Sequence, residues 1–173
     1  DCYINDAFGT AHRAHVSTGL VAAYFPEDKM FGYLMNAEVG SLNKVLKSGK
    51  KPFTAVLGGA KVSGKIQIID HLLDKVDNLI IGGGMMFTFI KAQGGKVGNS
   101  LVEDDLLELA LNTLEGAKLH GVNIILPVDT IAASGFANDA ETKLVKAGEV
   151  PEGWMCLDIG PESIALFDKV LMN

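Results

Sequence analysis

The chain has 173 residues, of which 48% are hydrophobic and 21% are charged, and its formal net charge is −6. This composition is typical of a globular protein, and the negative charge argues against general binding to nucleic acid. The sequence contains no run of about eighteen apolar residues, so we expect no membrane span and no membrane partner.

The charge is unevenly distributed along the chain. Eight basic and five acidic residues occur through Lys65, whereas seven basic and sixteen acidic residues follow it. A locally positive first third would help to steer a small phosphorylated substrate. Uneven surface charge tuned for solubility explains the same counts equally well.

The cysteine content and the first residues indicate the setting. Cys2 and Cys156 are the two cysteines and do not make a disulfide framework, which favours a reducing, cytoplasmic location. The chain starts without an initiator Met or a signal-peptide pattern. We therefore expect it to begin within a longer protein.

The first segment, Asp1–Thr10, reads as a short strand that ends in turn residues. After it lies Arg13, the only arginine of the chain, between His12 and His15. A guanidinium group grips carboxylate or phosphate in a bidentate way, so this segment is a candidate anion clamp. A surface salt bridge is the alternative, and we expect no metal site from the two histidines.

Two helices are expected before the next strand. The small apolar residues of Ser17–Phe25 indicate an inward-packed helix, and Glu38–Lys47 has the apolar spacing of an amphipathic helix. Ser48–Pro52 would close the second helix. We place a domain boundary near Met35–Glu38.

The segment Thr54–Lys65 has the pattern of strand, glycine turn, two cations and helix. Thr54–Leu57 reads as a buried strand, Gly58-Gly59 breaks it, and Lys61 and Lys65 precede a helical repeat. The unpaired N–H groups of a helix start suit an anion, most often phosphate. The segment nearly matches a Walker A loop, but Ile66 stands where Ser or Thr would hold magnesium. An ordinary turn with solvated lysines is the alternative.

The next segment repeats this pattern. Leu79–Ile81 reads as a second buried strand, Gly82–Gly84 follows, and Met85–Ala92 reads as a helix. We expect the helix's Met and Phe side chains to pack in the core, and we assign ligand approach to the three glycines because they lack a Cβ atom.

A loop is expected at 94–100, followed by a helix over Glu103–His120 that stops at Gly121, and then by a strand over Val122–Leu126. Asp129 just beyond that strand is either a ligand-side carboxylate or a helix cap, and we favour the cap.

The last third is expected to contain fewer regular elements. Ala137–Val150 reads as a polar loop, Trp154–Asp158 as a short apolar segment, and Gly160-Pro161 opens a final helix through Leu171. Alternating strands and helices joined by glycine turns predict a Rossmann-like parallel α/β sheet with helices on both faces. A fragment of a second α/β lobe would precede it.

Six segments, taken together, resemble the phosphoglycerate kinase family and occur in its order: Asp6–His15, Leu57–Lys65, Ile80–Phe89, Gly98–Asp105, Leu126–Asp129 and Gly153–Ser163. The resemblance implies a two-lobed glycolytic kinase that transfers a phosphoryl group between 1,3-bisphosphoglycerate and ADP, giving 3-phosphoglycerate and ATP. It implies that residues 1–36 end the 3-phosphoglycerate lobe, that 37–50 form the interdomain helix, and that 51–173 form an incomplete nucleotide lobe.

The resemblance also assigns site residues. His12 and Arg13 would bind 3-phosphoglycerate, and the catalytic residues would be Arg13, Lys61 and Lys65. The nucleotide-binding residues would be Gly59, Ala60, Lys61, Lys65, Gly83, Gly84, Leu101, Phe136, Cys156 and Leu157.

Three positions depart from the family's usual pattern. Gly64 stands where Asp or a small polar residue is common, Cys156 replaces a usual glycine and could crowd the adenine, and Ser134-Gly135 replaces a usual Asp-Lys. The basic first part of the substrate lobe, the later glycine-rich loops and the acidic residue for Mg²⁺ are not in this sequence.

We therefore expect Mg²⁺ to arrive with ADP or ATP, its protein ligand to lie outside this chain, and the 173-residue chain to be inactive alone. A monomer is expected for the full-length form. The alternatives are a nucleotide-binding α/β module without catalysis, and a structural remnant with no ligand.

Overall fold

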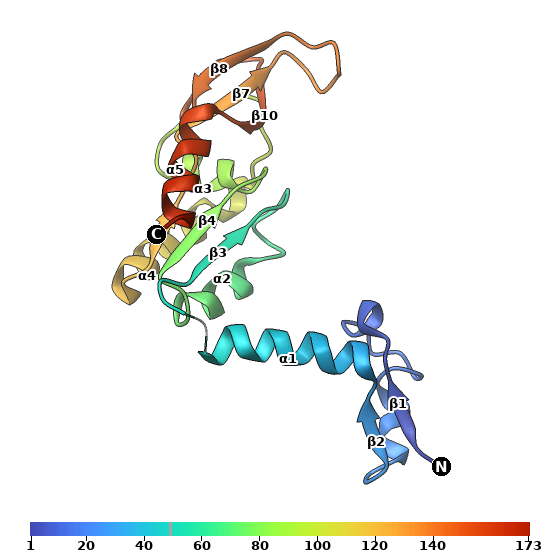
Figure 1. Cartoon of the computed structure of the whole chain (residues 1–173). Coiled ribbons are helices and arrows are strands. Elements are labelled where there is room, and N and C mark those ends of the chain that lie inside the picture. The colour runs from blue at the N-terminus through green and yellow to red at the C-terminus, as the bar shows by residue number, and fades with distance from the viewer. Residues whose placement is uncertain (49) are drawn as a thin grey trace. The chain divides into compact units, whose positions relative to one another are not determined.

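The computed structural model describes residues 1–48 and 50–173. The chain divides into two compact units, Asp1–Lys50 and Lys51–Asn173 (Figure 1). Gly49, part of the segment predicted to close the second helix, lies outside the described residues. That the two units correspond to the two lobes of a kinase stays a prediction.

The first unit contains a small parallel sheet and one long helix. Strand β1 (Tyr3–Asn5) pairs with β2 (Lys29–Phe31), the 3₁₀ helices η1 (Phe8–Thr10) and η2 (Leu20–Tyr24) lie between them, and α1 (Tyr33–Ser48) follows. The helix predicted over 17–25 is therefore wrong in type and length, because Ser, Thr and Gly at its start are weak helix formers.

Helix α1 begins five residues earlier than Glu38, the predicted start. The Asp6 carboxylate accepts a hydrogen bond from the Met35 N–H at 2.9 Å. A carboxylate on an N–H group of the first turn stabilises a helix start. The division into compact units places this helix in the first unit.

The second unit is built on a parallel sheet of strand order β3-β4-β6. These three strands lie where the apolar runs predicted them, whereas a short strand lies within the loop predicted at 94–100. The elements are β3 (Thr54–Leu57), α2 (Ile66–Leu73), β4 (Asn78–Ile81), α3 (Met86–Ala92), β5 (Lys96–Val97), η3 (Asp104–Leu106), α4 (Leu107–His120) and β6 (Asn123–Ile125). The helix expected over 103–120 thus starts with a 3₁₀ turn. It ends at Gly121 as predicted, and this glycine has a left-handed conformation with φ 72°.

The main core lies on one face of this sheet. Leu79 and Ile81 of β4 pack there with Ile69 of α2 and Ala110 of α4, and all four are fully or nearly fully buried. Phe87 and Phe89 of α3 join them, as do Met85 and Met86, which confirms the expected core role of these four side chains. On the opposite face Val56 of β3 is 61% exposed.

An antiparallel sheet of strand order β10-β7-β8 follows the parallel one. Its strands are β7 (Asp129–Ala133), β8 (Thr142–Lys146) and β10 (Met155–Ile159). The loop predicted over 137–150 is therefore wrong: β8 and the short β9 (Glu149–Val150), which pairs with β5, lie within it. In β8 exposed residues alternate with partly buried ones, as in a strand that has one face toward solvent.

The final helix, α5 (Pro161–Leu171), matches the prediction. Asp129 caps it from a distance: its carboxylate accepts hydrogen bonds from the N–H groups of Glu162 at 2.9 Å and Ser163 at 2.7 Å. Asp129 is 3% exposed, so the expectation of a helix cap is confirmed.

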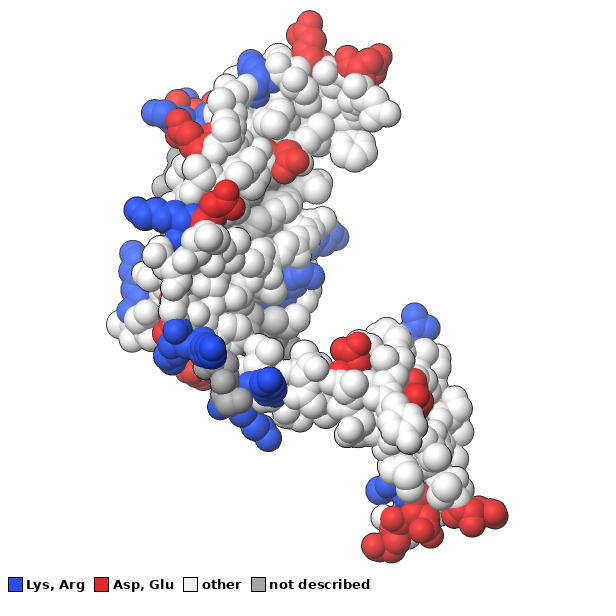
Figure 2. All heavy atoms as spheres, viewed as in Figure 1, with Lys and Arg blue, Asp and Glu red and all other residues white. Residues whose placement is uncertain are grey.

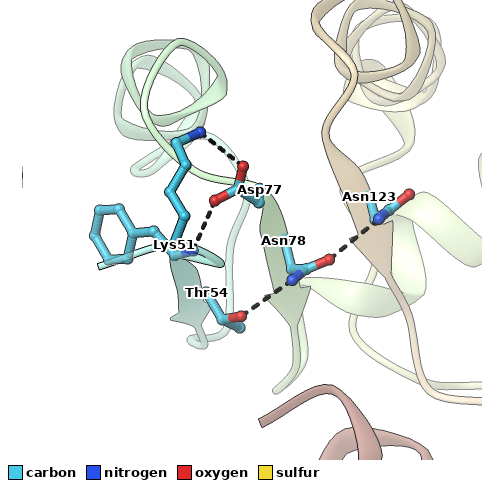
Figure 3. A network of polar contacts seen from close by, with 6 residues as sticks. Lys51, Thr54, Asp77, Asn78 and Asn123 are labelled. Atoms are coloured by element: carbon cyan, nitrogen blue, oxygen red, sulfur yellow. Dashed lines mark hydrogen bonds and ion pairs between the residues drawn. The ribbon is translucent and has the colours of Figure 1, made fainter. Parts of the chain in front are cut away.

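Polar side chains join the three parallel strands at their amino-terminal ends (Figure 3). The Asn78 amide donates to the Thr54 hydroxyl at 3.2 Å, and the Asn123 amide donates to the Asn78 carbonyl at 3.1 Å. Beside this ladder the Asp77 carboxylate accepts from Lys51 Nζ at 2.8 Å and from the Phe53 N–H at 2.7 Å. The contacts of the ladder join residues that are paired in the sheet, so they reinforce its register.

The mixed α/β class with a parallel sheet and packed helices is confirmed. None of the helices in the described residues combines the length and apolar character that a membrane crossing requires.

Candidate functional site

Two glycine turns meet at the carboxyl ends of β3 and β4. The Met85 N–H donates to the Gly59 carbonyl at 2.8 Å, and the Gly82 N–H donates to the Leu57 carbonyl at 2.8 Å. Gly83 has φ 65°, and a Cβ atom built on it would lie 2.7 Å from the Gly59 nitrogen. The second turn therefore packs directly on the backbone of the first, and only glycine fits there.

Lys65 folds back over the first turn. A Cβ atom built on Gly59 would lie 3.1 Å from the Lys65 Cε atom and 3.4 Å from its Nζ atom. The Lys65 ammonium group thus lies against the glycine backbone at the end of β3. Figure 2 shows basic atoms at the rim of the second unit where, in Figure 1, the loop between β3 and α2 lies. Lys61 in this loop is exposed.

The turn that precedes α2, within the loop suggested for phosphate, already binds a carboxylate of the chain itself. Glu103 Oε2 accepts hydrogen bonds from the N–H groups of Val62 at 2.5 Å and Ser63 at 3.0 Å, and Oε1 accepts from the Ser63 hydroxyl at 2.6 Å. Val62 and Ser63 lie in the turn before α2, so their N–H groups are already paired, whereas free amides at the start of the helix itself stay a prediction. The glycine turn and the two lysine side chains are further positions for an external anion.

The environment of Glu103 favours its ionised form. The hydrogen bond from the Ser63 hydroxyl lowers the pKa of the carboxyl; desolvation by burial opposes this. The Ser63 and Val62 N–H groups and the charge of Lys61 lower the pKa further, so the balance stays below the usual value. The sequence places Glu103 at the start of the helix predicted over 103–120, and no local signal indicates its contacts with a loop about forty residues earlier.

A cavity of about 360 Å³ lies next to the second turn. Its lining residues are Gly84, Phe87, Leu101, Phe136, Met155, Cys156 and Leu157. The structure thus brings together five of the residues assigned to nucleotide binding, whereas Phe87, assigned to the core, and Met155 were missed. Phe136 is 85% exposed and Leu101 is 57% exposed, so the cavity offers apolar side chains to a ligand.

Gly84 links this cavity to the first turn. A Cβ atom built on Gly84 would lie 3.2 Å from Leu101 Cδ1 and 3.3 Å from the Ala60 Cα and carbonyl oxygen atoms. The residue therefore lines the cavity on one side and touches the lysine-bearing loop on the other.

The Cys156 side chain is held in the cavity wall. Its Sγ atom lies 2.9 Å from the Thr130 hydroxyl, and its N–H donates to the Ser100 hydroxyl at 3.0 Å.

The other positions that depart from the family's usual pattern lie outside the cavity lining. Gly64 and Gly135 have open space at their Cβ positions. Ser134 closes a strand end, since its N–H donates to the Glu141 carbonyl at 2.9 Å and its hydroxyl accepts from the Glu141 N–H at 3.1 Å.

In the first unit, His12 and Arg13 lie together in the turn after η1. The Arg13 Nε–H donates to His12 Nε2 at 3.2 Å, and the Arg13 N–H donates to the Thr10 carbonyl at 2.9 Å. Both side chains are exposed. An exposed guanidinium group can grip a carboxylate or phosphate in a bidentate way.

A metal site needs several ligating side chains in one place. Within residues 1–48 and 50–173, no group of three or more His, Cys, Asp or Glu side chains is placed to hold an ion.

The chain is similar to known proteins over its whole length. A family profile described as "Phosphoglycerate kinase" matches residues 1–173. The chain is 58% identical to the phosphoglycerate kinase of Porphyromonas gingivalis over 100% of its own length and 42% of that protein. It is 53% identical to a cytosolic phosphoglycerate kinase of Nicotiana tabacum, covering 99% of the chain and 42% of the relative.

Solved structures give the same result. The structure of phosphoglycerate kinase from Coxiella burnetii matches with a TM-score of 0.92 and 42% identity, over 99% of this chain and 44% of that one. The enzyme from Pyrococcus horikoshii matches with a TM-score of 0.78 and 25% identity, over 98% of this chain and 43% of that one. The chain thus spans about two fifths of the length of the relatives that it matches.

Proposed function

Because the chain belongs to the phosphoglycerate kinase family, we propose that it acts as part of a glycolytic kinase. Joined to the remaining length that its relatives have, it would transfer a phosphoryl group between 1,3-bisphosphoglycerate and ADP, giving 3-phosphoglycerate and ATP. We call that longer protein the full-length enzyme.

One observation carries the nucleotide part of this proposal. Gly84 lines the apolar cavity and also touches Ala60 in the loop that bears Lys61 and Lys65. A nucleotide needs an apolar pocket for its base and, next to it, cations and backbone N–H groups for its phosphates. The cavity and the glycine turn supply these two environments side by side.

The proposed chemistry needs little covalent help from the protein. Phosphoryl transfer depends on in-line positioning and on neutralising charge on the moving group. Lys65, lying against Gly59, and Lys61 would neutralise that charge. The attacking group is already ionised, so no general base is required.

In the first unit we assign 3-phosphoglycerate binding to His12 and Arg13. The Arg13 guanidinium group is held by His12 Nε2 at 3.2 Å and is exposed, so it remains available to a carboxylate or phosphate. Mg²⁺ would accompany the nucleotide phosphates, with its protein ligand from outside the described residues. We expect a cytoplasmic monomer, as the name of the tobacco relative suggests for location.

The test is ATP formation from 1,3-bisphosphoglycerate and ADP. The full-length enzyme should turn over, whereas the isolated 173-residue chain should not. Lys65→Ala and Arg13→Ala in the full-length enzyme should each reduce turnover strongly. ADP binding without turnover by the full-length enzyme would instead support a nucleotide-binding module without catalysis, and absence of both would refute the proposal.

A further inference from the structure

We propose that Glu103 is a positioning residue that fixes the lysine-bearing loop, Gly58–Lys65, for the nucleotide phosphates. The inference rests on the proposed function, because it concerns the same nucleotide site. It assigns a role to an acidic side chain that would otherwise be unexpected beside an anion-binding loop, since like charges repel.

The loop is attached at two points to the segment around α3. At its start, the Gly59 carbonyl accepts from the Met85 N–H at 2.8 Å. At its end, Val62 and Ser63 donate to the Glu103 carboxylate. Glu103 is itself tied to α3, because its N–H donates to the hydroxyl of Thr88, which is 1% exposed.

Both lysines depend on the second attachment. Lys61 lies between the two attachment points, so its backbone is restrained from both sides. The N–H of Lys65 donates to the Val62 carbonyl at 2.8 Å. Fixing Val62 therefore also fixes the start of the turn from which the Lys65 side chain folds back to Gly59.

Glu103 also decides where an external anion can bind. Its carboxylate occupies the Val62 and Ser63 N–H groups in the turn before α2, which a phosphate could otherwise use. The phosphates are thereby left to the glycine turn and Lys65, next to the apolar cavity. A nucleotide whose phosphates settled on Val62 and Ser63 would be shifted along the loop, away from that turn.

The test compares Glu103→Ala, Glu103→Gln and Ser63→Ala in the full-length enzyme, with Asp105→Asn as the matched control. Asp105 is an exposed acid of η3, two residues after Glu103, so its variant removes one negative charge without touching the contacts with Val62 and Ser63. The readouts are the ADP dissociation constant from calorimetric titration, KM for each substrate, and hydrogen exchange of the Val62 and Ser63 amides.

Glu103→Ala should weaken ADP binding about tenfold, the effect of losing a charge-assisted hydrogen bond. KM for 1,3-bisphosphoglycerate should stay unchanged, and exchange at Val62 and Ser63 should accelerate. Glu103→Gln keeps one acceptor oxygen and should be intermediate, and Ser63→Ala should be milder. Asp105→Asn should match the unmodified protein in every readout.

Equal ADP affinity in Glu103→Ala and Asp105→Asn would overturn the inference, even if Glu103→Ala lowered the melting temperature, because the role would then be structural only. If Glu103→Ala fails to fold, Glu103→Gln and Ser63→Ala decide by the same comparison. Absence of turnover in the unmodified full-length enzyme would refute the proposed function alone, since ADP affinity still reports on Glu103.

Discussion

The contact between the two glycine turns makes a sharp prediction about Gly83→Ala. The new Cβ atom would lie 2.7 Å from the Gly59 nitrogen and 2.9 Å from its carbonyl oxygen, and Gly83 has φ 65°. The left-handed conformation costs about 1–2 kcal/mol for a residue with a Cβ atom. Pushing a packed backbone aside costs about 1–3 kcal/mol more, so we expect a loss of about 2–5 kcal/mol in the free energy of unfolding.

The neighbouring glycine gives the matched control. Gly82 has no atom within 4 Å of its Cβ position, so Gly82→Ala should change the free energy of unfolding by less than about 1 kcal/mol. Urea unfolding of both variants measures the difference, and ADP titration shows whether the displaced Gly59 turn also binds the nucleotide more weakly. Equal stability of the two variants would show that the turns do not touch as described.

The remaining predictions concern charges in the second unit. Lys65→Ala should weaken ADP binding by about 10- to 100-fold, and Lys75→Ala, at an exposed lysine beyond α2, should leave the titration unchanged. Asp129→Ala should lower the free energy of unfolding by about 3 kcal/mol, because it leaves the part-buried Glu162 N–H and the buried Ser163 N–H and hydroxyl groups without their carboxylate partner. Denaturant unfolding measures this. Burial raises the pKa of Asp129, but hydrogen bonds from Ser163 and from the Glu162 N–H group outweigh it, so the pKa of this carboxyl group is lowered. Hydrogen bonds likewise lower the pKa of Asp77 and of Glu103. Such carboxylates stabilise the fold above their unfolded pKa, about 4, so unfolding measured against pH should show stability falling as the pH drops through 4.

Local sequence signals predicted the parallel sheet well. The strands at Thr54–Leu57 and Asn78–Ile81 are short apolar runs that end in glycines, and such runs read as buried strands without knowledge of the rest of the chain. The cavity residues came from the resemblance to a family, and Gly84, Leu101, Phe136, Cys156 and Leu157 do line one cavity.

Other features depend on partners that are distant in the sequence. Strand β8 has only partly buried residues on one face and exposed residues on the other, so its composition resembles that of a loop. Its pairing with β7, which no local signal indicates, makes it a strand. Glu103 binds Val62 and Ser63 across about forty residues. No periodicity within the Glu103 segment could have shown which backbone N–H groups it would satisfy.

The side-chain ladder of Thr54, Asn78 and Asn123 has a consequence for mispairing of the strands. Because side chains alternate faces, a slip of β4 by one residue would turn Asn78 away from Thr54 and Asn123 and break both contacts. The same slip would carry Gly83 about 3.3 Å along β3, away from Gly59. A sheet with β4 in the wrong register would therefore lose both the side-chain ladder and the contact between the two glycine turns. A chain in which the ladder forms has thus also brought these turns together.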